Sequence, residues 1–246
     1  LWYCWNVNGA LAYLRKAGDY WQTAFKEIPV QDMTDDFHGP RESEQPPEAL
    51  PRFLTVGTGT ALTLYPALSE KPYLVSMQDT LCLFPGAAAH FTALFPPVLY
   101  FETADNQRIA GFIPFTRSDA WFGDDTASGM LCVSLPPHFI SPQSPAAEDT
   151  PLSLIRCPLV IRNHSKTPLE LDRLAIYTEP LSIYEYEGSL WSDTVAMDSL
   201  LGGNIEMNVL PETPESYRKI RAAERSGMKD ILIRQGADFI KNITSL

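Results

Sequence analysis

Hydrophobic and polar residues alternate along most of the chain, and a period of two is typical of strands that bury one face. The alternation is clearest in Pro158–Arg162 and Leu169–Tyr177, within a segment of residues 155–197 that shows almost no helical periodicity. Asn163–Lys166 and Glu187–Ser189 supply turn residues between the strands. We therefore expect a mainly β protein, with an antiparallel β-sandwich domain over residues 1–211.

The N-terminal segment predicts a meander of three aromatic-rich strands, at residues 2–7, 10–15 and 20–25. Asn8-Gly9 separates the first two and is a strong hairpin signal, because both central residues of a type I′ turn need positive φ. A helix over residues 9–28 is the alternative, since several apolar side chains there also have helical spacing. Gly18 and the clustered aromatic residues favour the strands.

Two segments rich in proline and polar residues predict long loops, at residues 31–51 and 136–151. Short strands are expected outside these loops, at residues 53–56, 61–65, 73–76, 80–84, 98–102 and 108–114. Residues 120–134 predict an aromatic segment, a Gly-Asp-Asp turn and another strand. Proline residues punctuate them, as is common at strand ends and edges.

Beyond residue 211 the pattern changes, and we expect a C-terminal helical segment over residues 212–246. Residues 214–225 are charged and helix-prone, with Pro214 suited to a first turn and Thr213 to a cap. After Gly227 the apolar residues are spaced to form one helical face. This face consists of Met228, Ile231, Leu232, Phe239, Ile240 and Ile243. We expect these residues to pack on the β domain or to bind a second copy or a protein partner.

The chain of 246 residues is 45% hydrophobic and carries a net charge of −11. This charge argues against non-specific binding to nucleic acid and against binding to an anionic membrane surface. No apolar run approaches the roughly 18–20 residues needed to span a bilayer. We therefore expect a cytoplasmic protein that neither binds nucleic acid nor inserts directly into a membrane.

No recognised motif for nucleotide binding, nucleophilic catalysis or zinc binding occurs. We therefore predict no catalytic residues, no cofactor and no metal site. His38 near Asp35 and Asp36 is most simply a solvated loop histidine, although a loop metal site is conceivable. The four cysteines, at positions 4, 82, 132 and 157, sit singly in apolar runs and are expected to be buried free thiols.

A sugar-binding or sugar-processing module is the alternative function. Two acidic pairs, Asp35-Asp36 and Asp124-Asp125, could supply the two carboxylates of a glycosidase. Adjacent acids in turns more commonly bind backbone amides. Aromatic residues at positions 121, 184, 186 and 191 could form a ligand platform, yet aromatics at strand spacing usually pack in a core or in cross-strand pairs.

Two stretches resemble the domain of unknown function 432, an uncharacterised prokaryotic family sometimes encoded near small-conductance mechanosensitive channels. They are Trp121-Phe122-Gly123 with Gly129–Cys132, and Ile161-Arg162-Asn163 with the strands through Tyr184 and Trp191. The resemblance covers most of residues 1–210. One departure is Val133-Ser134, where the family pattern has an arginine and an aromatic residue. The family has no assigned catalytic residues, so the resemblance implies a non-enzymatic accessory protein linked to a channel.

The leading hypothesis is therefore a non-enzymatic accessory protein that works through protein contacts or self-association, with the C-terminal apolar residues as the contact.

Overall fold

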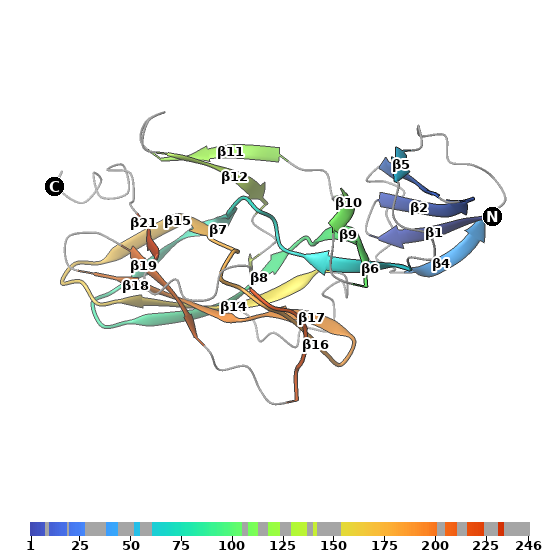
Figure 1. Cartoon of the computed structure of the whole chain (residues 1–246). Coiled ribbons are helices and arrows are strands. Elements are labelled where there is room, and N and C mark those ends of the chain that lie inside the picture. Colours follow the sequence, from blue (N-terminus) through green and yellow to red (C-terminus); the bar gives the residue numbers. More distant parts are fainter. Residues whose placement is uncertain are drawn as a thin grey trace. The chain divides into compact units, whose positions relative to one another are not determined.

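Every regular element in the described part of the chain is a strand, numbered β1 to β21 (Figure 1). The computed structural model describes residues 1–7, 10–18, 20–27, 38–43, 52–54, 61–104, 108–112, 118–123, 129–136, 140–141, 154–200, 205–210, 216–223 and 231–233. These residues contain no helix, so the predicted mainly β class is confirmed.

Within the described part of the chain, no helix has the length and apolar character required to cross a membrane.

The chain divides into two compact units. Unit 1 comprises residues 1–68, 96–117 and 150–154, and unit 2 comprises residues 69–95, 118–149 and 155–246. The predicted boundary between a domain of residues 1–211 and a segment of residues 212–246 stays a prediction.

Unit 1 consists of two sheets in which all described pairings are antiparallel. The first sheet has the order β4-β1-β2-β3-β5 and the second β10-β9-β6. The strands of the first sheet are β1 (Trp2–Val7), β2 (Ala10–Ala17), β3 (Tyr20–Glu27), β4 (His38–Ser43) and β5 (Arg52–Leu54). Those of the second are β6 (Leu62–Ala67), β9 (Val98–Thr103) and β10 (Arg108–Phe112).

The core of unit 1 joins side chains from both of its sheets. Ala12 and Leu14 of β2 share one face because they are two residues apart, and they cluster with Leu99 and Phe101 of β9. The ring of Trp5 meets the ring of Phe101 edge-on, with centroids 5.5 Å apart. The alternation seen in the sequence is thus the pattern that buries this face.

Unit 2 consists of a four-stranded and a nine-stranded sheet. The smaller has the order β11-β12-β7-β15, formed by β7 (Tyr73–Leu83), β11 (Ser118–Phe122), β12 (Met130–Leu135) and β15 (Leu169–Ile176). The larger has the order β20-β16-β17-β14-β18-β19-β21, with β8 also beside β14 and β13 beside β8. Its strands are β8 (Ala88–Phe95), β13 (Ile140–Ser141), β14 (Ile155–Asn163), β16 (Ile183–Tyr186), β17 (Ser189–Ser192), β18 (Thr194–Ser199), β19 (Ile205–Leu210), β20 (Arg218–Arg221) and β21 (Ile231–Ile233).

Both sheets of unit 2 are mixed, so the prediction of a wholly antiparallel arrangement was too narrow. Strand β12 runs parallel to β7, and β17 and β18 both run parallel to β14. The reason lies in the connections: after β14 the chain passes to β15 in the smaller sheet and then returns to the larger one. An even alternation of apolar residues does not encode this crossing.

The predicted N-terminal meander is confirmed by β1, β2 and β3, and the alternative helix is wrong for the described residues of this segment. Two strands fall inside the predicted loops. Strand β4 pairs with β1, and β13 pairs with β8. Both are formed by pairing with an existing edge, which the polar composition of these segments does not reveal.

The predicted C-terminal helix is wrong where the structure describes that part of the chain. Arg218–Arg221 form β20, which pairs with β16, and Ile231–Ile233 form β21, which pairs with β19. Pairing with an open sheet edge overrides the weak helix propensity of these residues. The other members of the predicted apolar face, Met228, Phe239, Ile240 and Ile243, lie outside the described residues.

Candidate functional site

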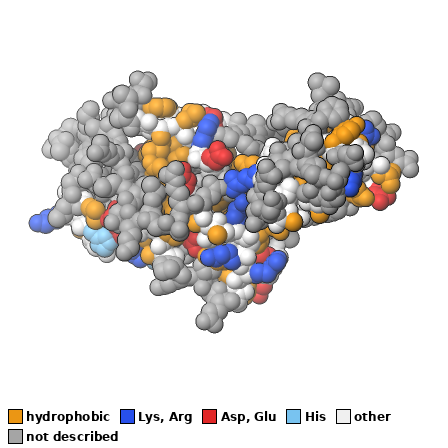
Figure 2. Space-filling model, in the orientation of Figure 1, with side chains coloured by type: hydrophobic (Ala, Val, Ile, Leu, Met, Phe, Trp, Pro, Cys, Tyr) orange, Lys and Arg blue, Asp and Glu red, His pale blue; other side chains and the backbone are white. Residues whose placement is uncertain are grey.

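Large hydrophobic side chains reach the surface at several places in the described part of the chain, between charged groups (Figure 2). Two of them lie opposite each other on neighbouring strands: Trp121 of β11 is 44% exposed, and Leu131 of β12 is 43% exposed. These two side chains form a continuous apolar surface on one hairpin, which we call the β11–β12 surface.

The indole of Trp121 is held in place by the glycine that immediately precedes the neighbouring strand. A Cβ atom at Gly129 would lie 2.3 Å from Nε1 of Trp121, so the ring rests directly against the backbone at the start of β12. Only glycine leaves this space. Gly123, with a φ of 145°, follows the end of β11 and adopts a conformation that favours glycine. The Trp-Phe-Gly and Gly-hydrophobic-Cys motifs therefore fix a half-exposed indole.

Strand β11 is an outer strand of its sheet. It pairs with β12 over Ser118–Phe122 without a bulge. Lys71 Nζ contacts Asp119 Oδ2 at 2.5 Å and so ties the start of β11 to the segment before β7. An outer strand has backbone groups on one side that the sheet itself does not pair, and they can pair with another extended chain.

The other outer strands in the described part of the chain carry features that discourage such pairing. Strands β4, β10, β15 and β20 have a register shift where they pair, β5 and β21 have three residues each, β13 has two, and β6 contains Pro66. Strand β20 also carries Arg218, Lys219 and Arg221. Bulges, shortness, proline and cationic side chains all protect sheet edges. Strand β11 contains none of these features.

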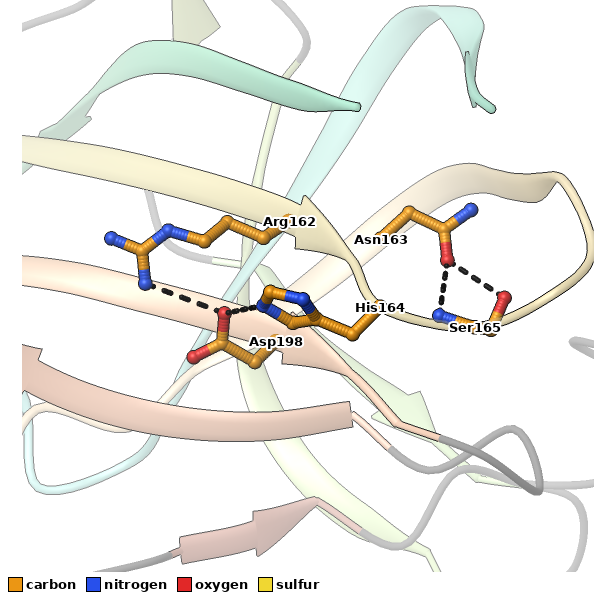
Figure 3. A network of polar contacts seen from close by, with 5 residues as sticks. All are labelled: Arg162, Asn163, His164, Ser165 and Asp198. Carbon is orange, nitrogen blue, oxygen red and sulfur yellow. Dashed lines mark hydrogen bonds and ion pairs between the residues drawn. The ribbon is translucent and has the colours of Figure 1, made fainter. Parts of the chain in front are cut away.

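Two segments at one end of unit 2 form a second well-defined surface, which we call the rim. They are residues 84–90, the turn after β7 with the start of β8, and residues 162–168, the end of β14 with the turn after it. The buried Asn163 holds them together. Its Nδ2 donates to the carbonyls of Leu83 (2.8 Å) and Thr167 (2.9 Å). Its Oδ1 accepts from the backbone N–H and the hydroxyl of Ser165 (Figure 3). Every polar atom of this amide therefore has a structural partner.

Beside this amide, Arg162 and His164 both point at Asp198 of β18 (Figure 3). Arg162 Nη1 lies 3.4 Å and His164 Nε2 lies 3.1 Å from Asp198 Oδ1. The Ser165 hydroxyl instead contacts Asn163 and Thr167. The imidazole of His164 and the hydroxyl of Ser165 thus have different partners, and the backbone N–H of His164 donates to the carbonyl of Ser199 at 3.0 Å, so these contacts fix the turn against β18.

The aromatic platform suggested by the sequence is assembled only in part. Tyr184, Tyr186 and Trp191 lie on the neighbouring strands β16 and β17, whereas Trp121 belongs to the other sheet. The ring of Tyr186 stacks on Tyr217 at 4.5 Å between centroids, and Trp191 lies 5.6 Å from Tyr217. The hydroxyl of Tyr184 donates to Asp193 Oδ1 at 2.7 Å.

Two cations complete this aromatic cluster. The guanidinium of the buried Arg156 lies 5.7 Å from the ring of Trp191, and Lys219 Nζ lies 5.3 Å from the ring of Tyr184. Sequence reasoning missed Tyr217 and Lys219, because it assigned residues 214–225 to a helix, and it had no signal for Arg156.

The remaining predicted residues are one histidine and two acidic pairs. His38 lies in β4, and the acidic pairs Asp35-Asp36 and Asp124-Asp125 lie outside the described residues. The described residues contain no group of three or more His, Cys, Asp or Glu side chains that could hold a metal ion.

All four cysteines are free thiols, as expected, but their burial differs. Cys132 and Cys157 are buried, and burial raises the pKa of Cys132 to about 11 and that of Cys157 to about 12. Cys82 is exposed, so the expectation that it is buried was wrong. It is the second-last residue of β7, close to the rim.

No curated protein and no solved structure matches the chain. One family model does match, over residues 9–236, and its description is "Protein of unknown function (DUF432)". The match includes both the β11–β12 surface and the rim. Because it covers nearly the whole sequence, the chain belongs to the DUF432 family.

Proposed function

We propose that this protein is a non-enzymatic accessory protein that binds an extended segment of another protein along β11. The observation that carries the proposal is the half-exposed Trp121, fixed by Gly129 on an outer strand that lacks protective features. The added strand would pair with the backbone of β11, and its side chains would contact Trp121 and Leu131.

Two physical arguments support this mode of binding. Tryptophan is among the residues that contribute most to protein interfaces, and strand addition supplies main-chain hydrogen bonds together with side-chain selectivity. A side chain that is already fixed loses little conformational entropy on binding. Gly129 provides this fixation for Trp121 before a partner arrives.

The charge of the chain favours a different protein over a second copy. Each copy carries a net charge of −11, and residues 118–132 contain three aspartates but no lysine or arginine. Association of two such segments is opposed by repulsion, whereas a segment with lysine or arginine is attracted. The proposed partner is therefore an extended apolar segment that carries basic residues.

A displayed library of random peptides tests this proposal with a defined probe. Peptides selected on the wild-type protein should be rich in β-branched, aromatic and basic residues. Their affinity for Trp121→Ser should be at least about tenfold lower, because an interface tryptophan commonly contributes 2 kcal/mol or more. Phe84→Ser, which alters another exposed aromatic side chain, is the matched control and should bind them normally.

The proposal fails if no selected peptide depends on Trp121. Native mass spectrometry of the purified protein, which measures its oligomeric state, is the second part of the test. A dimer that Trp121→Ser dissociates would show that the strand comes from a second copy, and the proposed basic partner would then be wrong.

Several earlier expectations remain part of the proposal. We propose that each unit is a β-sandwich; in unit 1 the shared cluster of Leu14 and Phe101 supports this arrangement.

A cytoplasmic location, a link to a membrane channel and a contact through the C-terminal apolar residues also stay proposals. For the last, Phe239→Asp with Ile240→Asp should remove a partner or oligomer without unfolding the protein, and a collapse of thermal stability instead would indicate packing within the chain.

A sugar-binding module is the second candidate, favoured by the stacking of Tyr186 on Tyr217 beside Trp191. Both tyrosine rings are partly exposed, and Lys219 lies nearby. Aromatic faces with adjacent polar groups suit a saccharide. A glycan array should then show ligands that bind wild-type protein and not Tyr217→Ala; binding that survives this substitution would exclude the cluster as the site.

A further inference from the structure

The most exposed large hydrophobic side chain of the described residues is Phe84, at 68%. It begins the turn between β7 and β8, where Pro85, Gly86 and Ala88 are also exposed. The backbone N–H of Ala87 donates to the carbonyl of Phe84 at 2.9 Å, and Gly86 has a φ of 77°. Proline followed by glycine with positive φ is typical of a type II turn. The rim thus projects one aromatic ring from a tight, apolar turn.

This turn is held from behind by Asn163. In addition to its side-chain bond to Leu83, the backbone carbonyl of Asn163 accepts from Gly86 N–H at 2.8 Å. Its backbone N–H donates to the carbonyl of Ala87 at 2.9 Å. These hydrogen bonds on both sides of the turn hold the backbone that carries Phe84, so the exposed position of this residue is set by the fold.

The charge at the rim is opposite to that of the whole chain. Residues 84–90 and 162–168 include Arg162, Lys166 and two histidines but no carboxylate. Asp198 reaches the rim from β18, where it contacts both Arg162 and His164, and Glu170 lies further along, opposite Cys82. Lys166 is exposed. A chain with a net charge of −11 therefore has one end whose turns are cationic and apolar.

We propose that the rim docks shallowly on the surface of an anionic lipid bilayer, with Phe84 entering the boundary between headgroups and acyl chains. Arg162 and Lys166 would lie at the level of the anionic headgroups. An aromatic side chain combined with cations is the usual composition of such interfacial contacts. The projecting ring suits a fluid bilayer, which can close around it. Repulsion of the acidic remainder would leave the rim as the contact, and no part of the chain need span the membrane.

We expect the affinity of this contact to be low, because it uses one large apolar side chain and two cations. It is independent of the strand-binding surface, since Phe84 and Trp121 lie on different elements of unit 2. The expectation of poor binding to anionic membranes rests on the net charge of the whole chain. Salt screens charges that lie more than about 8–10 Å from the bilayer, so the charges of the rim itself decide this contact.

Sedimentation of the full chain with phosphatidylcholine vesicles that contain phosphatidylserine tests the proposal. We expect the wild-type protein to bind these vesicles and to be released by salt. Phe84→Ser should lower the partition coefficient between vesicles and water about tenfold, and Lys166→Ala should lower it about fivefold. Trp121→Ser is the matched control and should sediment like the wild type. Unchanged thermal unfolding of each variant verifies that the fold is intact.

The proposal is overturned if wild-type protein does not bind vesicles of any phosphatidylserine content, or if Phe84→Ser binds as well as wild type. It is also overturned if Trp121→Ser reduces sedimentation as much as Phe84→Ser does. Loss of vesicle binding in Phe84→Ser with normal peptide binding separates this proposal from strand addition. If Phe84→Ser instead abolishes binding of the selected peptides, the rim is a surface for protein contact and the membrane proposal is wrong.

Discussion

The β11–β12 surface and the rim each display one aromatic side chain to solvent, but they hold it by different means. The ring of Trp121 is fixed by the space that Gly129 leaves just before the neighbouring strand. The backbone that carries Phe84 is held by hydrogen bonds between Asn163 and the residues on either side of it. The exposed position of each ring is thus set by the fold, and the two should respond to different kinds of substitution.

The largest effect is expected when the hydrogen-bonded fixation of the rim is removed. Asn163→Ala leaves the carbonyl of Leu83 without its side-chain donor in a buried position, and it removes a second hydrogen bond at the carbonyl of Thr167, which keeps the hydroxyl of Ser165. An unsatisfied buried group costs about 1–3 kcal/mol and a lost hydrogen bond about 1 kcal/mol, so the free energy of unfolding should fall by about 2–4 kcal/mol in urea titrations. Ser165→Ala, which removes one partner of the same amide at a less buried position, should cost clearly less. A loss below about 0.5 kcal/mol in Asn163→Ala would contradict this account of the rim.

The second effect concerns the packing that fixes Trp121. Gly129→Val should displace the indole, with a loss of about 1–3 kcal/mol typical of overpacking and a loss of peptide binding. Combining it with Trp121→Ala should recover part of the stability, because the ring that collides is gone.

A matched control exists in unit 1. There the ring of Tyr100 lies against Gly111, where a Cβ atom would be 2.5 Å from the ring. Gly111→Val should destabilise to a similar degree without affecting the selected peptides. If Gly129→Val and Trp121→Ala prove additive in a double-mutant cycle, the glycine does not act through the indole.

Thiol chemistry provides a third, smaller contrast between the two surfaces. Exposed Cys82 near the rim should react with a maleimide or disulfide reagent at pH 8 in the folded protein. Cys132 of β12 and Cys157 of β14 have pKa values raised to about 11 and 12, chiefly by burial. Their thiolate fractions at pH 8 are therefore only about one in a thousand and one in ten thousand.

Labelling of Cys132 reports opening of the β11–β12 hairpin. Gly129→Val should accelerate its labelling, measured by mass spectrometry, and leave Cys157 slow, whereas Asn163→Ala should accelerate both by destabilising the whole unit. Equal acceleration of the two thiols in Gly129→Val would show that the hairpin does not open separately.

Much of the fold was predictable because local signals agree with it. The strands β1 to β3 follow their predicted positions, and Glu187 and Gly188 form the expected turn between β16 and β17, with φ values of 49° and 74°. Positive φ at both central residues fits a type I′ hairpin. Where a turn and an alternating pattern coincide, sequence alone locates the hairpin.

Long-range pairing was not predictable in the same way. The cationic strand Arg218–Arg221 has a helix-prone composition, and it is extended because β16 provides an edge to pair with. The parallel pairing of β14 with β18 depends on a connection that passes through the other sheet. Both outcomes are decided by partners distant in sequence, which a local period cannot identify.

The candidate surfaces were predicted only as motifs. The resemblance drew attention to Trp121 and Gly129, but alternation suggested a packed aromatic strand, and the contact between indole and glycine became visible only in three dimensions. Nothing in the sequence indicated that Phe84 is exposed, since Phe-Pro-Gly is typical of an ordinary strand end. Exposure depends on what the rest of the fold leaves uncovered.

The smallest effect is expected at β20, the protected edge that contrasts with β11. Arg218 Nε donates to Glu185 Oε2 at 3.0 Å, and this hydrogen bond, together with that from the Gly188 N–H, holds the pKa of Glu185 below its ordinary value. Because the folded pKa is the lower one, the stabilising contribution is present above the ordinary glutamate pKa of about 4.3 and is lost as the pH falls through the folded value. The pair is exposed, so Glu185→Gln should shift the urea midpoint only slightly at pH 7. The midpoints of the variant and the wild type should converge at a pH below this folded value, as carboxyl protonation abolishes the difference. A difference that persists unchanged at that pH would mean that Glu185 acts through packing, and the protection of this edge would then rest on its bulge and its cations alone.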